Sequence, residues 1–168
     1  VIEYHSSKDW SPKKIRVYDI SRDKVALTYE EIKFYRNGQK KTERTYKDGE
    51  KDGKATEWYE NGQKGLEGTY KDGELDGLET WWHENGQKKK EGTYKDGELN
   101  GLLTYWYENG QKREEGTFKD GEPDGLWTRW YENGQKSGKG TFKDGVLISV
   151  KCWDEDGNEV DCPEWMLN

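Results

Sequence analysis

One 24-residue pattern recurs along most of this chain, and that periodicity constrains the fold more than any other feature. The tetrapeptide Asn-Gly-Gln-Lys begins at Asn37, Asn61, Asn85, Asn109 and Asn133. Lys-Asp-Gly keeps the same step and begins at Lys47, Lys71, Lys95, Lys119 and Lys143. A further Asp-Gly or Asn-Gly falls at Asp52, Asp76, Asn100 and Asp124. A fixed period of this length is typical of an array in which each repeat is one supersecondary unit.

The dipeptides that punctuate the repeat predict that each copy is a β-hairpin. Asn-Gly and Asp-Gly suit type I′ turns, which need positive φ at both central residues. Between the turns, Leu78, Thr80 and Trp82 fall on one face of a strand, and the residues between them fall on the other. The frequent glycines and the lack of a 3.6-residue apolar period argue against helical repeats. We predict strands around residues 68–71 and 78–83, joined by an acidic loop and followed by the Asn85-Gly86 turn.

The predicted fold class is therefore all-β: an elongated single-sheet solenoid of tandem 24-residue hairpins with a cap at each end. A lone hairpin is marginal in water, so neighbouring repeats must stabilise one another. We expect an N-terminal capping segment over 1–29, five repeats over 30–145, and a partial repeat with a cap over 146–168. The segments proposed as caps are more aliphatic than the repeats, and contain Ile15, Val17, Tyr18 and Ile20 at one end and Val146, Leu147, Ile148, Val150, Trp165, Met166 and Leu167 at the other.

The composition indicates an ordered chain with a thin aromatic core. Leu, Ile, Val and Phe make up only 24 of 168 residues, a level at which disorder is the usual interpretation. Against disorder stand a net charge of only −7 and an aromatic content of 14 %, including 9 Trp and 11 Tyr. Each large ring buries roughly 150–250 Å², so few residues supply much of a core. The acidic balance argues against nucleic acid as a partner and, more weakly, against an anionic membrane surface.

The cellular compartment stays open at this point. No apolar run approaches the roughly 20 residues that a membrane helix needs, and no signal peptide is visible. Because the chain begins at Val1 rather than Met, we expect a processed or trimmed product. Localisation is therefore unknown, either cytoplasmic or exported after removal of a signal peptide.

The repeat resembles a known family. Residues 91–101, Glu-Gly-Thr-Tyr-Lys-Asp-Gly-Glu-Leu-Asn-Gly, followed by Trp-Tyr-Glu-Asn-Gly at 106–110, are similar to the MORN repeat and more closely to its bacterial variant, MORN-2. Long proteins of this kind are often labelled YwqK-family antitoxins, and the segment ending at Cys162 also looks similar to them. The resemblance covers about 120 residues. It implies a twisted single sheet of hairpins that binds rather than catalyses.

Comparison of the repeats with one another separates constant columns from variable ones. The constant columns are predicted to form the structural core through stacking of hairpin on hairpin, and their members include Trp58, Trp82, Trp106, Trp130, Tyr70 and Tyr94. The variable columns lie on the opposite face from the Trp column and hold the candidate binding residues Trp81, Leu103, Tyr105, Trp127 and Arg129. This apolar group predicts an exposed binding patch. The alternative is that the sheet's own curvature or a terminal segment covers the patch.

No motif predicts a metal, a cofactor or a catalytic centre. The stretch 72–77 resembles the first half of a calcium loop, but loop position twelve is His83 and the flanks are strands. His5 and His83 are the only histidines, and neither sits in a nucleophile or metal motif. Cys152 and Cys162 flank the Asp156-Gly157 turn. A disulfide across that turn and two free thiols remain equal alternatives.

The function that fits best is a non-enzymatic scaffold for protein–protein interaction, with an antitoxin-like role as its specific version. The alternative is a cell-surface or periplasmic module that binds carbohydrate, choline-like groups or lipid headgroups on aromatic side chains. The expected partner is an unidentified protein rather than nucleic acid, with glycan or membrane contact less favoured, and the oligomeric state stays open.

Overall fold

The computed structural model describes residues 13–19 and 26–164. In that part of the chain, all regular secondary-structure elements are β-strands. The chain divides after Gly86 into two compact units. The first unit holds β1 (Lys13–Asp19), β2 (Ala26–Phe34), β3 (Lys40–Lys47), β4 (Glu50–Trp58), β5 (Lys64–Lys71), β6 (Glu74–Leu75) and β7 (Gly77–Trp82). The second unit holds β8 (Lys88–Lys95), β9 (Glu98–Trp106), β10 (Lys112–Lys119), β11 (Glu122–Trp130), β12 (Lys136–Lys143), β13 (Val146–Trp153) and β14 (Glu159–Val160).

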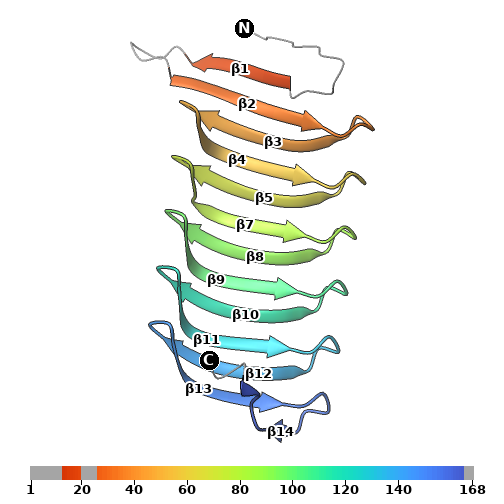
Figure 1. Ribbon diagram of the computed structural model, residues 1–168, viewed down its shortest axis with the longest axis vertical. Helices are drawn as coiled ribbons and strands as arrows, with labels where there is room; N and C mark the ends of the chain where they lie inside the picture. The colour runs from red at the N-terminus through yellow and green to blue at the C-terminus, as the bar shows by residue number, and fades with distance from the viewer. Residues whose placement is uncertain (1–12, 20–25, 165–168) are drawn as a thin grey trace. The chain divides into compact units, whose positions relative to one another are not determined.

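Within each unit, consecutive strands pair antiparallel in an open sheet. Figure 1 shows tight turns along one side of each unit and longer turns along the other. The prediction of an all-β array of hairpin repeats is confirmed. Of the predicted capping residues, Ile15, Val17 and Tyr18 lie in β1, whereas Ile20, Trp165, Met166 and Leu167 lie outside the described residues.

The tight turns are the Lys-Asp-Gly segments. Each Asp has φ between 47° and 52°, and the Gly after it also has positive φ, as at Asp72 (48°) and Gly73 (88°). Two consecutive residues of this kind define the type I′ turn, which matches the twist of the flanking strands. The predicted acidic loop at 72–77 is wrong, because the strand resumes at Glu74 directly after the two turn residues.

The Asn-Gly-Gln turns have a different geometry from the predicted type I′ turn. Gly38 has φ of 86°, but Asn37 has no positive φ. The Asn37 side chain instead holds two turns together. Its Oδ1 accepts a hydrogen bond from the Gln39 amide at 3.0 Å, and its Nδ2 donates to the Glu60 carbonyl of the next turn at 3.0 Å. The same pair of bonds recurs at Asn61, Asn109 and Asn133.

A tyrosine ladder adds a second bond between successive repeats. A Tyr that directly follows a strand ending in Phe or Trp donates its hydroxyl proton to the Trp carbonyl of the next repeat, at 2.7–2.9 Å. The donors are Tyr35, Tyr59, Tyr107 and Tyr131. The last two of these bonds differ in span, since Tyr131 reaches Trp153 over 22 residues and Tyr107 reaches Trp130 over 23. This shorter step agrees with a partial sixth repeat that comes one residue early.

The glycine of the further Asp-Gly or Asn-Gly dipeptide lies inside a strand rather than in a turn at Gly53 of β4, Gly101 of β9 and Gly125 of β11. Gly53 and Gly101 have φ of 109° and 129°, and the strand register shifts beside them. A glycine of this kind marks a β-bulge, which bends the strand and increases its twist.

The two faces of each sheet differ in what they carry. We call one the tryptophan face, which holds the Thr and Trp columns, and the other the glycine face, which holds Gly68 in the first unit and Gly92, Gly116 and Gly140 in the second. On the tryptophan face the threonines are buried (Thr56, Thr80, Thr104 and Thr128), while Trp58, Trp82, Trp106 and Trp130 are half-buried. A lysine ammonium lies 5.6–5.8 Å from the centre of each of these Trp rings.

One buried hydroxyl gives a stability prediction. The Oγ1 of Thr42 is buried and has no hydrogen-bond partner among the described residues. Thr42→Val keeps the shape and removes the unpaired polar group, so we expect the free energy of unfolding to rise by about 1 kcal/mol. Urea unfolding measures it. Thr104→Val serves as the control, because the Thr104 hydroxyl has a partner in Glu115 at 3.4 Å, and an equal gain in both variants would contradict the explanation.

Candidate binding face

The glycine face of the second unit brings together four of the five predicted binding residues. Leu103 lies opposite Gly92 and Gly116, and Trp127 lies opposite Gly116 and Gly140. Tyr105 and Arg129 both lie opposite Glu114, one on each neighbouring strand. Trp81 belongs to the first unit, opposite Leu66, and is 37 % exposed.

The prediction of a continuous exposed apolar patch is wrong for Leu103. Its side chain is only 4 % exposed, because it occupies the space left by the glycine on the neighbouring strand. Trp127 is half-buried for the same reason. Its ring packs edge-on between Phe118 and Phe142, with centroid distances of 5.5 and 5.6 Å. Both residues contribute to the core of the glycine face.

Tyr105 and Arg129 remain partly accessible beside a polar cluster. The Arg113 guanidinium lies 5.0 Å from the centre of the Tyr105 ring. Arg129 pairs with Glu114 through two contacts, Nε to Oε1 at 3.1 Å and Nη2 to Oε2 at 3.2 Å. The Arg129 side chain is 34 % exposed and that of Glu114 12 %. This two-pronged geometry fixes the guanidinium more firmly than a single contact does.

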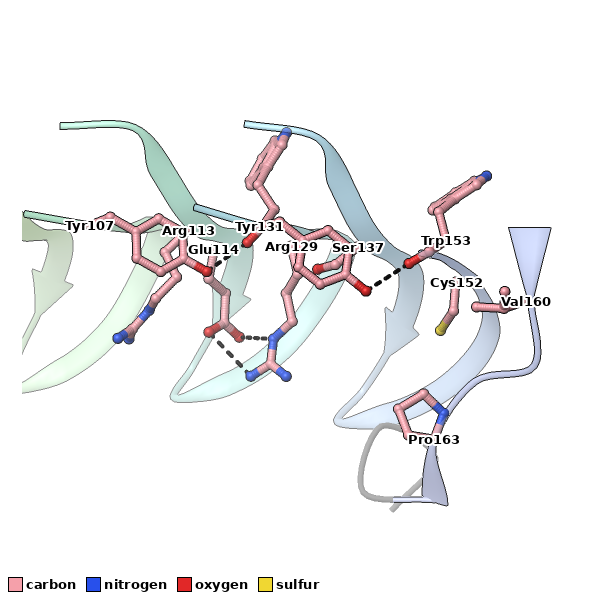
Figure 2. A pocket seen from close by; sticks show the side chains of 11 residues that line it. Tyr107, Arg113, Glu114, Arg129, Tyr131, Ser137, Cys152, Trp153, Val160 and Pro163 are labelled. Atoms are coloured by element: carbon pink, nitrogen blue, oxygen red, sulfur yellow. Dashed lines mark hydrogen bonds and ion pairs between the residues drawn. The ribbon is translucent and has the colours of Figure 1, made fainter. Parts of the chain in front are cut away.

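A cavity of about 360 Å³ opens next to this ion pair. Tyr107, Tyr131, Glu114 and Arg129 line one side, and Val160 and Pro163 of the C-terminal segment line the other. Figure 2 shows the two tyrosines and the ion pair on one side of the sheet, with the Trp153 ring on the opposite side. The volume lies in the range of small-molecule and side-chain pockets.

Small residues create this hollow. The column that holds Leu66, Lys90 and Glu114 in earlier repeats holds Gly138 in the last one, and Ser137 beside it lines the cavity. The far wall is fixed by a disulfide between Cys152 of β13 and Cys162, whose Cα atoms are 5.2 Å apart. Cys152 is buried and lies opposite Val160. The lone glycine in an otherwise larger column is the sequence signal that would have located the cavity.

The tyrosine hydroxyls in the cavity already serve the fold. Tyr107 and Tyr131 donate hydrogen bonds to main-chain carbonyls of the next repeat. Their aromatic rings, and not their hydroxyl protons, are therefore available to contact a molecule in the cavity. Burial raises the pKa of the Tyr107 phenol above its ordinary value, an effect that Arg113 opposes and Glu132 reinforces. Tyr107 therefore stays protonated at neutral pH, as its hydrogen bond requires. Neither Tyr107 nor Tyr131 was among the predicted binding residues.

The tryptophan face carries a regular set of ion pairs that also stabilise the sheet. Lys64 and Lys54 contact the Glu67 carboxylate at 2.7 and 2.9 Å. Partial burial alone would raise the pKa of Glu67, but the hydrogen bonds from Lys64 and Lys54 outweigh it and lower the pKa.

We expect acid to weaken this cluster in a definite direction. A depressed folded-state pKa means that Glu67 stabilises the fold above its unfolded pKa, and that this stabilisation is lost as pH falls through the folded value. Glu67→Gln should lower the free energy of unfolding at pH 7 by up to about 1 kcal/mol and make no difference once the carboxylate is protonated. Urea unfolding across the acidic range measures this. The exposed Glu60→Gln is the control, and an equal loss at every pH would contradict the prediction.

The described part of the chain shows no cluster of metal-ligating side chains. No group of three His, Cys, Asp or Glu side chains within residues 13–19 and 26–164 is placed to hold a metal ion. Over the same residues, no helix is long and apolar enough to span a bilayer.

Comparison with known families identifies the repeat. The family model for the MORN repeat variant matches residues 30–48, 51–72, 75–96, 99–120 and 123–144. The related MORN repeat model matches residues 115–126. A search of curated proteins finds no match to the chain. The matched segments fall within the predicted repeats, and each one ends at the Asp of a tight Lys-Asp-Gly turn.

Proposed function

The chain belongs to the MORN repeat variant family, whose repeats generally build protein- or membrane-binding scaffolds, and from this premise we propose that it is a non-enzymatic scaffold that binds a protein partner. The binding site that we propose is the cavity beside Arg129 in the second unit. One observation carries the proposal: the Glu114–Arg129 pair borders a hollow whose other wall is apolar. An arginine anchored beside a pocket is a common energetic centre of protein interfaces.

The cavity suits one side chain of a partner rather than a large substrate. Tyr131 and Pro163 offer apolar surface, while Arg129 and Ser137 offer hydrogen-bonding groups at one end. Tyr105, with Arg113 over its ring, lies on the strand next to Glu114 and extends the contact surface. Of the residues predicted from sequence, Tyr105 and Arg129 therefore remain proposed contact residues. Leu103 and Trp127 lie two residues earlier on the same strands and belong to the packed core of that face.

A double variant tests this site without leaving an unpaired charge. Glu114→Gln with Arg129→Gln removes both charges but keeps most of the side-chain volume. We expect the wild-type chain to capture a protein from extracts of its own host, and the double variant to lose that protein. Arg44→Gln with Glu57→Gln is the matched control, because these residues form the corresponding type of ion pair in the first unit.

The control decides between binding and folding effects. Both double variants must unfold at similar denaturant concentrations for the comparison to hold. If both double variants still capture the host protein, or if neither does, the cavity beside Arg129 is not the binding site. If the captured protein is a toxin, co-expression of this chain should restore growth, which is the outcome that an antitoxin-like role requires.

A second candidate function also has an observation in its favour. Two tyrosine rings and a carboxylate border the same cavity, a combination that suits choline-like cations through cation–π contact. Glu114 is already neutralised by Arg129, which is why we rank protein binding first. Titration with choline, followed by the NMR signals of Tyr107 and Tyr131, tests the alternative. Saturable shifts of both rings at millimolar choline would favour it.

A further inference from the structure

The regular ion pairs of the tryptophan face are interrupted in the last full repeat. In four repeats, a Lys and the Glu three residues later form an ion pair; the pairs are Lys40–Glu43, Lys64–Glu67, Lys88–Glu91 and Lys112–Glu115. In the fifth repeat the corresponding residues are Lys136 and Lys139. Both are exposed, and neither has an ion-pair partner within 4 Å in the part of the chain that the structure describes.

The strand register places a second like charge beside Lys139. Along this row of the second unit, Glu91 and Glu115 alternate with Thr104 and Thr128. The row then ends with Lys139 directly opposite Lys151.

Like charges at directly opposed positions destabilise a sheet. Lys151 contacts the Glu159 carboxylate at 3.2 Å, which leaves Lys136 and Lys139 as the uncompensated charges of the group. Lys139, in place of the Glu of the other repeats, is therefore expected to destabilise the sheet locally. A role in binding would explain why Lys stands at this position.

Exposed apolar side chains lie on β11 and β13, the two strands that pair with β12. Leu126 is on the same face as Thr128, two residues earlier on β11, and is 51 % exposed. On β13, which pairs with the other side of β12, Val146 and Ile148 are each 63 % exposed. In earlier repeats the place of Val146-Leu147-Ile148 is taken by polar segments such as Glu122-Pro123-Asp124. Leu78 and Leu102 occupy the column of Leu126 and are similarly exposed, so the apolar residues gained here are Val146 and Ile148, on the strand that pairs with β12.

We infer that this surface, defined by Lys136, Lys139, Lys151, Leu126, Val146 and Ile148, docks an acidic protein segment that also carries apolar side chains. Charge complementarity selects an anionic partner, and the exposed Leu, Val and Ile give it an apolar contact. A protein segment fits better than a membrane surface, because the chain as a whole has a net charge of −7 and would be repelled by an extended anionic surface. The surface lies on the opposite face of the sheet from the cavity beside Arg129, so it is a second site beyond the proposed function.

The experiment uses defined polymers as probes. Binding of a glutamate–tyrosine copolymer to the full chain is measured by calorimetry at low salt, with poly-glutamate as the probe of charge alone. Phosphatidylserine vesicles and duplex DNA are titrated in parallel. We expect the copolymer to bind more tightly than poly-glutamate, and neither vesicles nor DNA to bind with comparable affinity.

The decisive variant is Lys139→Glu, which restores the residue found at this position in the other repeats. We expect copolymer affinity to fall about tenfold, since the change removes an attraction and adds a repulsion of the size seen for exposed charges. The Tm should stay the same or rise, because the Lys139–Lys151 repulsion is removed. A purely structural role for Lys139 would move the Tm downward instead.

The control variant is Arg36→Glu, which makes the same change in net charge within the first unit. Arg36 is exposed, and the other repeats carry Glu at its position, as at Glu60 and Glu108. Copolymer affinity should not change in this variant, nor in the Glu114→Gln/Arg129→Gln double variant.

Three results would overturn the inference. The first is a wild-type chain that fails to bind the copolymer. The second is equal weakening by Lys139→Glu and Arg36→Glu. The third is Lys139-dependent binding to vesicles or DNA that exceeds binding to the copolymer, which would assign the surface to a membrane or to nucleic acid.

Discussion

Gly116→Ala should lower the free energy of unfolding by about 3 kcal/mol, at the upper end of the cost of overpacking a core. A Cβ atom on Gly116 would lie 2.2 Å from Cε3 of the Trp127 ring, far inside normal contact distance. The ring cannot retreat easily, because Phe118 and Phe142 pack against it on both sides. Urea unfolding of the second unit, followed by Trp fluorescence, measures the loss.

The same substitution in the first unit gives the matched control. A Cβ on Gly68 would lie 3.2 Å from a methyl group of Leu75, which can move by a few tenths of an ångström. Gly68→Ala should therefore cost less than about 1 kcal/mol. Trp127→Leu should rescue Gly116→Ala, since it reproduces the arrangement of Leu103 beside Gly92. Equal losses at Gly68 and Gly116, or no rescue, would show that the Trp127 ring is not held in place.

Cleavage of the Cys152–Cys162 disulfide should lower the stability of the second unit by about 3 kcal/mol, the value expected for a loop of this length. The two cysteines are 10 residues apart in sequence and close the turn that carries Val160. Loss of the bond frees this segment, so the wall of the cavity beside Arg129 is lost as well. Partner binding at that cavity should weaken in parallel with stability.

Thiol titration and unfolding under reducing and oxidising conditions measure both effects. Protein kept in air should show fewer than two free thiols after denaturation. Cys162→Ser is preferable to a change at Cys152, because Cys152 is buried in the sheet. That variant should have the stability of the reduced wild type and should not respond to reductant. Two free thiols after deliberate oxidation would refute the pairing.

Much of the fold was predictable because the sequence contains five copies of one repeat, which can be compared with one another. Five copies of Lys-Asp-Gly at a constant step identified the hairpins, and the type I′ geometry at Asp72-Gly73 follows from the residues themselves. The Asn-Gly-Gln turns were predicted to be turns but with the wrong geometry. Asn37 bonds to the next repeat rather than adopting positive φ, and a bond of that kind depends on a neighbour 23 residues away.

The candidate site was predicted less well, and Leu103 shows why. Strand alternation correctly placed Leu103, Tyr105, Trp127 and Arg129 on one face of the second unit. Strand alternation alone does not predict how deeply a side chain is buried. Leu103 is buried because glycines flank it on both neighbouring strands, and those glycines occur in a separate column of the repeat.

By itself, then, the sequence determined the all-β class, the 24-residue hairpin period and the residues that share a face, because these depend on short-range turn chemistry and a period of two. Tertiary structure alone decided which members of a face are accessible. It also decided that the Cys152–Cys162 bond fixes the far wall of the cavity beside Arg129, and that Lys139 lies opposite Lys151. The physical reason is register: which side chains meet depends on how neighbouring strands align, and each bulge shifts that alignment in a way that the spacing of residues does not encode.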